Sequence, residues 1–306
     1  MRTEPVLIGV AGDSGAGKST LIRELSQLLG PDKVAVIGLD DYHSLNRQER
    51  KAVGITPLNP RANNLGLFIE HLYRLRQGEK VLKPVYDHDT GDFGDPEWVE
   101  PRPFIICEGL HPFCFGVLAE MYDYRVYYDT HPELKVAWKV QRDAAHRGYT
   151  VEQVRREIRQ RQWDIRGFVE PQWWYADTVV TLIPPADDGS VIGVQLKEPP
   201  PGTQHSGSEC WVGAQTLKPR EAGKIRTARE WYGGREMWVT AITMPLTQEE
   251  LRELGTAFGI TEAVLRRVKG EEAIPFQVLL SLLAARLEQI RKQKESYGRE
   301  RYAVGG

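Results

Sequence analysis

The segment that most constrains the fold of this chain is GDSGAGKST, residues 12–20. It follows the apolar run VLIGVAG, which is typical of a buried strand, and leads into LIRELSQLL, which is typical of a helix. A glycine-rich turn between a strand and a helix lets the backbone wrap a phosphate group, while the first N–H groups of the helix point at the same anion. The pattern predicts a phosphate-binding loop rather than an ordinary glycine-rich turn.

The residue types inside this loop predict how it binds a nucleoside triphosphate. We expect Lys18 to reach the terminal phosphates and the Ser19 hydroxyl to hold Mg²⁺. The residues expected to contact the nucleotide are Gly12, Asp13, Ser14, Gly15, Ala16, Gly17, Lys18, Ser19 and Thr20. The loop does not identify the molecule that receives the phosphate.

Short apolar runs alternate with helical patterns over the first part of the chain. The further strand-like runs are VAVIGL, FIICEG, RVYYD and DTVVTL. Residues 62–78 and 132–148 each end in a basic turn followed by glycine, as helices commonly do. This alternation predicts an α/β three-layer sandwich with a mostly parallel central sheet.

The alternation of strand-like and helical segments ends after Ile183. Turn-rich segments separate two more strand-like runs, VIGVQLK and EMWVTAIT, and AIPFQVLLSLLAARLEQIRK is typical of a final helix. We therefore divide the chain into a part built around the phosphate-binding loop, 1–188, and a C-terminal part, 189–306. We expect the second part to extend the sheet and to be integrated with the first.

Charge and composition narrow the class of protein. Among 306 residues, 40 basic and 42 acidic side chains leave a formal net charge of −2, so no global field favours nucleic acid or an anionic membrane. No apolar run approaches the ~20 residues of a membrane-spanning helix, and the strand that begins at Val6 leaves no room for a signal peptide. We expect a cytoplasmic protein.

Cys107, Cys114 and Cys210 are too few and too dispersed for a disulfide framework or a zinc site.

A second group of polar residues, LDDYHSLNRQERK, follows the run VAVIG. Asp40 lies at the C-terminal end of a predicted strand, where open α/β sheets bind ligands. Phosphoryl transfer to a hydroxyl needs a carboxylate that accepts the proton, and an anionic acceptor needs cations such as His43, Arg47 and Arg50. A helix cap followed by a solvated basic helix is the alternative for this segment alone.

Two later segments favour a small-molecule kinase. FIICEGLHP ends a predicted strand at Glu108, the expected place for a second carboxylate near Mg²⁺. KVQRDAAHR places Lys139 and Arg142 on neighbouring helical positions and Arg147 at the helix exit, which suits a lid, although a solvated basic face explains that helix alone. The absence of NKxD and LSGGQ motifs disfavours a guanine-nucleotide switch and a transporter-type ATPase.

In order and spacing, several segments of the chain resemble the signature segments of the phosphoribulokinases. They are GDSGAGKST, LDDYHSLNRQERK, TPLNPRANN, KPVYDHDTGDF, EGLHP, AWKVQRDAAHRG and EPQWWYADTVV. REWYGGREMWVTAIT and the final helix resemble, more weakly, the C-terminal part of the plant and cyanobacterial type. The resemblance implies a P-loop NTPase fold, a homodimer formed through the sheet edge, and ATP- and Mg²⁺-dependent phosphorylation of the C1 hydroxyl of D-ribulose 5-phosphate. The product, D-ribulose 1,5-bisphosphate, belongs to Calvin-cycle carbon fixation.

The resemblance also implies residue roles. Asp40 would be the catalytic base, acting with Lys18 and Arg142, whereas Asp41 would have a structural role. Ser19 and Glu108 would serve the metal. The substrate-binding residues would be His43, Arg47, Arg50, Tyr86, His88, Lys139, Arg142 and Arg147.

Two other functions stay open on the sequence. A uridine-kinase-like nucleoside kinase would phosphorylate an uncharged acceptor and leave Arg47 without a partner. A non-catalytic nucleotide-binding regulator would be expected to lack the base or the lysine, yet Asp40, Lys18 and Glu108 are all present.

The resemblance raises one further expectation, about redox control. The best-known phosphoribulokinases are switched off by a disulfide between a P-loop cysteine and a second one just before the DDYH segment, and Ala16 and Gly38 occupy those places here. A Cys107–Cys114 disulfide is not excluded by sequence separation, but free thiols are the usual state in the cytosol. We therefore predict activity that is not gated by a disulfide.

Overall fold

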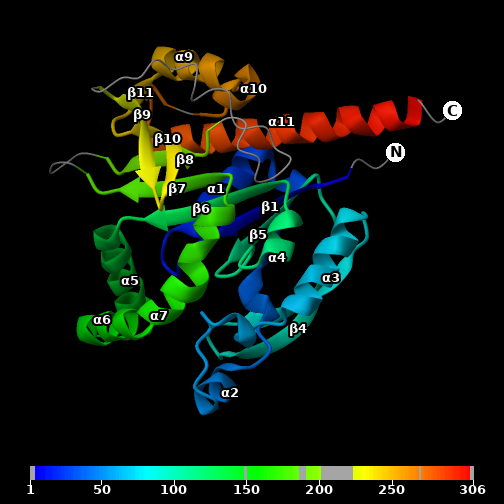
Figure 1. Ribbon diagram of the computed structural model, residues 1–306, viewed down its shortest axis with the longest axis vertical. Coiled ribbons are helices and arrows are strands. Elements are labelled where there is room, and N and C mark those ends of the chain that lie inside the picture. The colour runs from blue at the N-terminus through cyan, green and yellow to red at the C-terminus, as the bar shows by residue number, and fades with distance from the viewer. Residues whose placement is uncertain (1–3, 148–149, 186–190, 201–222, 269, 304–306) are drawn as a thin grey trace.

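The computed structural model describes residues 4–147, 150–185, 191–200, 223–268 and 270–303. An eight-stranded sheet in the order β2-β5-β1-β6-β7-β8-β10-β9 runs through them (Figure 1). Its strands are β1 (Val6–Ala11), β2 (Val34–Gly38), β5 (Phe104–Gly109), β6 (Tyr124–Thr130), β7 (Thr178–Ile183), β8 (Gly193–Glu198), β9 (Ile225–Tyr232) and β10 (Arg235–Ile242). From β2 to β7 neighbouring strands are parallel, and from β7 to β9 they are antiparallel.

The helices lie in two layers around this sheet and in arms beyond it. They are α1 (Lys18–Leu29), α2 (Arg47–Ala52), α3 (Leu65–Arg76), α4 (Gly116–Glu120), α5 (Pro132–Arg147), α6 (Val151–Gln160), α7 (Gln162–Asp164), α9 (Gln248–Phe258), α10 (Glu262–Leu265) and α11 (Pro275–Ala303). A short 3₁₀ segment, η2 (Leu39–Tyr42), follows β2. The pairs β3 (Val81–Asp87) with β4 (Asp92–Val99), and β11 (Leu246–Thr247) with β12 (Glu272–Ala273), form separate two-stranded sheets.

Alternate side chains of β1 are buried on opposite faces of the sheet. Val6, Ile8 and Val10 belong to an apolar cluster with residues of α1 and α11, whereas Leu7 and Ala11 belong to a second cluster with residues of α3 and α4. A parallel strand that is buried on both faces has a continuous run of apolar residues in its sequence. This is why β1 could be predicted from the sequence. The predicted three-layer sandwich with a mostly parallel sheet is confirmed.

The C-terminal segments extend the same sheet, as expected. Val194 of β8 and Ile242 of β10 share one buried cluster with Val180 of β7, so the apolar core continues across the predicted boundary at residue 188. Helix α11 contacts α1, β1 and β8. The division into 1–188 and 189–306 stays a prediction, because the core offers no independent measure of where one part ends.

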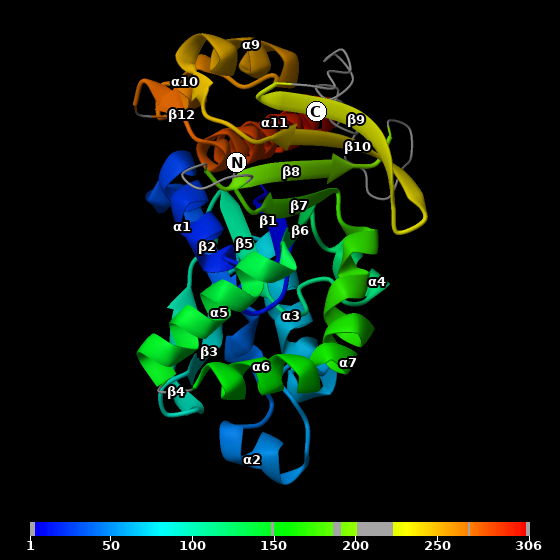
Figure 2. The same cartoon turned by 90° about the vertical axis from the view of Figure 1, so that its left-hand side faces the viewer.

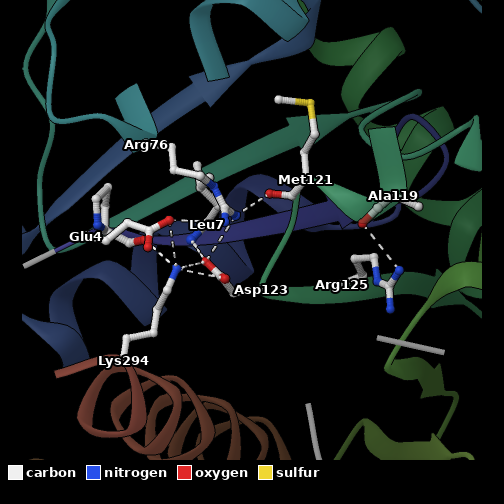
Figure 3. A network of polar contacts seen from close by, with 9 residues as sticks. Glu4, Leu7, Arg76, Ala119, Met121, Asp123, Arg125 and Lys294 are labelled. Carbon is white, nitrogen blue, oxygen red and sulfur yellow. Dashed lines mark hydrogen bonds and ion pairs between the residues drawn. The ribbon is translucent and has the colours of Figure 1, made fainter. Parts of the chain in front are cut away.

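A network of charged groups fixes α11 to the N-terminal edge of the sheet (Figure 3). The Lys294 ammonium donates to the Asp123 carboxylate and to the backbone carbonyl of Pro5. Arg76 of α3 lies 3.5 Å from the same carboxylate and 3.2 Å from that of Glu4. These contacts join both helical layers to the start of β1.

Helix α2 and the β3–β4 hairpin lie at one end of the long axis, and α9 and α10 lie at the opposite end (Figures 1 and 2). Helices α5, α6 and α7 lie in the same half of the molecule as α2 and the hairpin. Every residue of β4 except Val99 is exposed, so this strand lacks the buried face by which strands are recognised in sequence. No helix of the described residues is long and apolar enough to cross a membrane.

Candidate active site

The phosphate-binding loop lies between the end of β1 and the start of α1. Gly17 has φ 95° and caps α1 without a side-chain hydrogen bond, so the first N–H groups of this helix are not satisfied by a cap. A Cβ at Gly12 would lie 2.2 Å from the carbonyl oxygen of Tyr128, which requires glycine there. The loop is therefore shaped as a cradle of backbone donors that fits a polyphosphate.

The Lys18 ammonium lies across this loop. It donates to the carbonyl oxygens of Gly12 and Asp13, at 2.9 Å each, and the residue is buried. The motif predicts that this cation contacts phosphate oxygens, and that role stays a prediction.

The two adjacent aspartates of η2 have different surroundings. The Asp41 carboxylate accepts hydrogen bonds from the Lys83 ammonium and from the backbone N–H of Tyr86, and its side chain is 20% exposed. The Asp40 side chain is 43% exposed and lies 3.5 Å from the His88 imidazole. Asp41 thus ties η2 to β3, and Asp40 is the more exposed of the two carboxylates.

Glu108 at the end of β5 lies close to the same charges. In the register of the sheet it is paired with Gly38 of β2 and with Val10 of β1. Burial raises the pKa of Glu108, Lys18 lowers it, and Asp40 and Asp41 raise it further. A cation beside Glu108 would relieve this repulsion.

The charges and donor atoms of this site fit Mg²⁺. Among the described residues no group of three or more His, Cys, Asp or Glu side chains is arranged as a metal site. Mg²⁺ commonly binds through one or two protein oxygens together with phosphate oxygens and water. Ser19, the second residue of α1, and Glu108 stay the predicted protein ligands.

The predicted cations of α2 contact the β3–β4 hairpin. Arg47 donates through its guanidinium to the backbone carbonyls of His88 and Asp89, and its own N–H donates to Gly91. A Cβ at Gly91, where φ is 78°, would lie 2.6 Å from the Arg47 Nε. Arg47 therefore packs against the turn that carries His88.

Arg50 is buried and makes two contacts. Its guanidinium donates to the carbonyl of Leu45 and, at 2.7 Å, to the hydroxyl of Tyr86. The Tyr86 ring in turn makes perpendicular contacts with His43 and His88, with ring centroids 4.7 Å and 5.3 Å apart. The structure thus brings together four of the expected substrate-binding residues, His43, Arg50, Tyr86 and His88, and His88 contacts Asp40. Tyr86 is at the centre of this group and is held by Arg50.

Of the expected lid residues, only Lys139 has a described side chain, and it is buried on α5. Arg142 and Arg147 belong to α5, but their side chains lie outside the described residues.

Lys135, one turn before Lys139, was not predicted. Its ammonium is 3.1 Å from Asp129 and 3.7 Å from Asp13 of the loop. Burial alone would lower the pKa of Lys135, but these two carboxylates outweigh it and raise the pKa.

Sequence reasoning also missed Asn63 and His111. Asn63 contacts His43 directly, and His111 contacts Asn63. Both lie within segments of the family resemblance, TPLNPRANN and EGLHP, which is the one sequence signal that could have singled them out.

Comparison with known proteins identifies the family. The profile of the Phosphoribulokinase / Uridine kinase family matches residues 7–187, more than half of the chain. The chain belongs to this family. Within the phosphoribulokinase/uridine kinase family, it is 49% identical over 179 residues to phosphoribulokinase of Synechocystis sp.. That match covers 58% of this chain and 54% of the relative.

More distant relatives come from both branches of the family. The chloroplastic phosphoribulokinase of Arabidopsis thaliana is 40% identical over 215 residues, covering 63% of this chain and 54% of its own length. Uridine kinase of Chloroflexus aurantiacus is 34% identical over 188 residues, covering 58% of this chain and 88% of its own length. The chain thus spans about half the length of the Synechocystis and Arabidopsis phosphoribulokinases that it matches.

Among solved structures, phosphoribulokinase from Rhodobacter spheroides matches 95% of this chain and 99% of its own. The TM-score is 0.57 and the sequence identity 18%. At this identity the match shows the fold, and it includes the C-terminal strands and the final helix that lie beyond the family profile.

Proposed function

We propose that the protein is an ATP-dependent kinase that phosphorylates the C1 hydroxyl of D-ribulose 5-phosphate to give D-ribulose 1,5-bisphosphate. The observation that carries the proposal is the group formed by Asp40, His43, Tyr86 and His88. Asp40 and His88 of this group and Lys18 of the phosphate-binding loop all act on the pKa of Glu108, Asp40 raising it and the other two lowering it. An accessible carboxylate next to histidine and arginine side chains suits an acceptor that has both a reacting hydroxyl and an anionic group.

In this mechanism each described residue has a physical task. The backbone N–H groups of the loop and Lys18 bind the ATP phosphates, and Asp40 accepts the proton of the attacking hydroxyl. Ser19 and Glu108 would hold Mg²⁺, and the ion would supply positive charge against the phosphates. Arg47, through the hairpin turn, holds His88 beside Asp40, and Arg142 and Arg147 of α5 are proposed to close over the phosphates.

The second candidate is a nucleoside kinase, because a uridine kinase is 34% identical to the same part of the chain. The basic side chains near Asp40 and His43, those of Arg50 and His88, favour the sugar phosphate, since an uncharged nucleoside has no anionic group for them. The identity of 49% to a phosphoribulokinase favours the same choice. A regulator without activity is less consistent with the retained Asp40, Lys18 and Glu108.

An ADP-release assay distinguishes these functions. The purified protein is supplied with ATP and Mg²⁺ and with ribulose 5-phosphate, uridine or no acceptor. We expect rapid ADP release only with ribulose 5-phosphate. Equal or faster release with uridine would assign the nucleoside kinase, and nucleotide binding without acceptor-dependent release would assign the regulator.

The homodimer and the cytoplasmic location are part of the same proposal. Strand β2 is one edge of the sheet, and Val36 on it is 45% exposed, which is consistent with a contact there. Light scattering during size-exclusion chromatography tests the dimer, and fractionation of the source cells tests the location.

A further inference from the structure

A chain of hydrogen bonds joins the backbone carbonyl of Leu58 to His43 through His111 and Asn63. His111 Nε2 lies 2.7 Å from the carbonyl oxygen of Leu58. His111 Nδ1 lies 3.3 Å from Asn63 Nδ2, and Asn63 Oδ1 lies 2.7 Å from His43 Nδ1. His111 is 1% exposed, so water does not replace these partners.

The direction of every bond in this chain follows from its first member. A carbonyl oxygen can only accept, so His111 Nε2 carries a proton. Burial lowers the pKa of His111 to about 4, so this imidazole is neutral near pH 7 and its Nδ1 is an acceptor. Asn63 therefore presents its amide N–H to His111 and its oxygen to His43, and that oxygen can only accept.

The consequence for His43 is a fixed tautomer. Its Nδ1 must carry the proton that Asn63 accepts, so in the neutral ring Nε2 bears the lone pair. No described residue forms a hydrogen bond with His43 Nε2, whereas the ring packs edge-on against Tyr86 beside Asp40. The group offered to a ligand is thus an acceptor.

We propose that Asn63 and His111 are positioning residues that hold His43 in the Nδ1-protonated tautomer, so that its Nε2 accepts a hydrogen bond from a hydroxyl group of the acceptor sugar. The proposal rests on the proposed function for the identity of that sugar. It separates two tasks within the substrate site. His43 reads a hydroxyl, which can donate, and the anionic phosphate, which can only accept, is left to the arginine and lysine side chains.

The charges around His43 agree with a neutral ring. Burial lowers the pKa of His43. Asp40 of η2 and the hydrogen bond to Asn63 raise it, and Arg50 of α2 and His88 next to the hairpin turn lower it. A change at Asn63 should therefore alter the protonation of this ring without removing any of its charged neighbours.

Nitrogen NMR of histidine tests the tautomer without any assay of activity. Protein labelled with ¹⁵N-histidine is examined at pH 8 by long-range ¹H–¹⁵N correlation, and the His43 signals are assigned by their loss in His43→Gln. We expect the Nδ1-protonated pattern for His43 and the Nε2-protonated pattern for His111. An Nε2-protonated or doubly protonated His43 in the unmodified protein would overturn the proposal.

Asn63→Asp is the sharpest variant, because it keeps the size of the side chain and replaces the amide by a second acceptor. The new carboxylate should raise the pKa of His43 and turn Nε2 into a donor at neutral pH. Asn64→Asp is the matched control: it adds the same charge one residue away, at an exposed position where aspartate can still cap α3.

In Asn63→Asp we expect kcat/KM for ribulose 5-phosphate at pH 7 to fall roughly tenfold or more, the worth of one lost hydrogen bond to a polar group. The loss should shrink as pH rises above the new pKa of His43, and KM for ATP should stay unchanged. Asn64→Asp should match the unmodified protein. A loss that does not vary with pH, with both variants folded by circular dichroism, would contradict the inference. If the protein does not use ribulose 5-phosphate, the proposed function falls, while the NMR result decides separately whether Asn63 and His111 fix the tautomer.

Discussion

Lys294 of α11 places its ammonium 2.8 Å from both carboxylate oxygens of Asp123, 171 residues earlier in the chain (Figure 3). Asp123 also accepts the backbone N–H of Leu7 in β1, at 2.8 Å. One carboxylate therefore holds a strand of the central sheet and the last helix together, and both side chains of the ion pair are less than one fifth exposed.

Lys294→Met should lower the free energy of unfolding by about 1–3 kcal/mol, because it leaves a half-buried carboxylate with fewer partners while Leu7 and Arg76 remain. Lys292→Met is the control, since it makes the same change at an exposed position of the same helix. Urea denaturation measures both. Equal losses in the two variants would show that the ion pair contributes nothing specific.

Glu198 makes stability depend on pH. Burial raises the pKa of its carboxyl to about 7, although Thr178 and Arg286 act in the opposite direction. The folded protein thus binds a proton there that the unfolded chain releases near its ordinary pKa of about 4.3. The contribution of this group to stability is complete below that pH and is lost as pH rises to about 7.

Glu198→Gln should remove this dependence, so the variant should gain stability relative to the unmodified protein on going from pH 5 to pH 8. The slope removed is at most about 1.4 kcal/mol per pH unit. Denaturation at several pH values provides the measurement, with the exposed Glu253→Gln as control. Parallel pH profiles for Glu198→Gln and the unmodified protein would show that Glu198 titrates normally.

Asp40→Asn should leave ATP binding near normal and reduce kcat by roughly 10²–10⁴, the usual contribution of a positioned general base. Asp41→Asn should behave differently, because it removes one of the two carboxylates paired with the buried Lys83, leaving Glu97, and so should lower stability. Steady-state kinetics and thermal unfolding of both variants separate the two effects. An Asp40→Asn enzyme that keeps most of its turnover would exclude Asp40 as the base.

Arg47→Ala should mainly raise KM for the sugar phosphate. Its guanidinium binds the backbone of the turn that carries His88, one of the proposed sugar-phosphate-binding residues, so its loss should weaken binding of that substrate. Lys51→Ala, at an exposed position of α2, should change neither constant. If KM for ATP rose instead, the cation would belong to the nucleotide site.

Activity should be insensitive to mild oxidation. Cys107 and Cys114 are free, and burial raises the pKa of both thiols, that of Cys114 to about 12, so little reactive thiolate is present. Cys210 lies outside the described residues. The enzyme is assayed after treatment with a dithiol oxidant and again after reduction. A large reversible loss that disappears in Cys107→Ser or Cys114→Ser would reveal a redox switch.

The sequence predicted those parts of the fold that have a local signature. Strands β1 and β5, buried on both faces, appear as unbroken apolar runs, and the loop before Lys18 has a fixed pattern of glycines. The β3–β4 hairpin was not predicted, because β4 is exposed along nearly its whole length and so has no alternation of apolar and polar residues.

The candidate site was predictable only as a set of residues. Asp40 and Glu108 were indicated because each ends a predicted strand, but nothing local distinguishes Asp41, which bonds Lys83, from Asp40. The contacts of His43 with Asn63, and of Asn63 with His111, join residues 20 and 48 positions apart. Such pairings are set by the packing of separate loops and leave no periodic pattern in the sequence.

The covering of β1 by α11 has a consequence for how the chain folds during translation. The ribosome makes β1 before α11, so one face of this strand is without its final cover until the segments between them and α11 itself have been synthesised. Contacts between such distant segments form slowly, and an exposed apolar face favours aggregation in the meantime. The nascent protein should therefore depend on chaperones more than an isolated α/β domain with only local contacts.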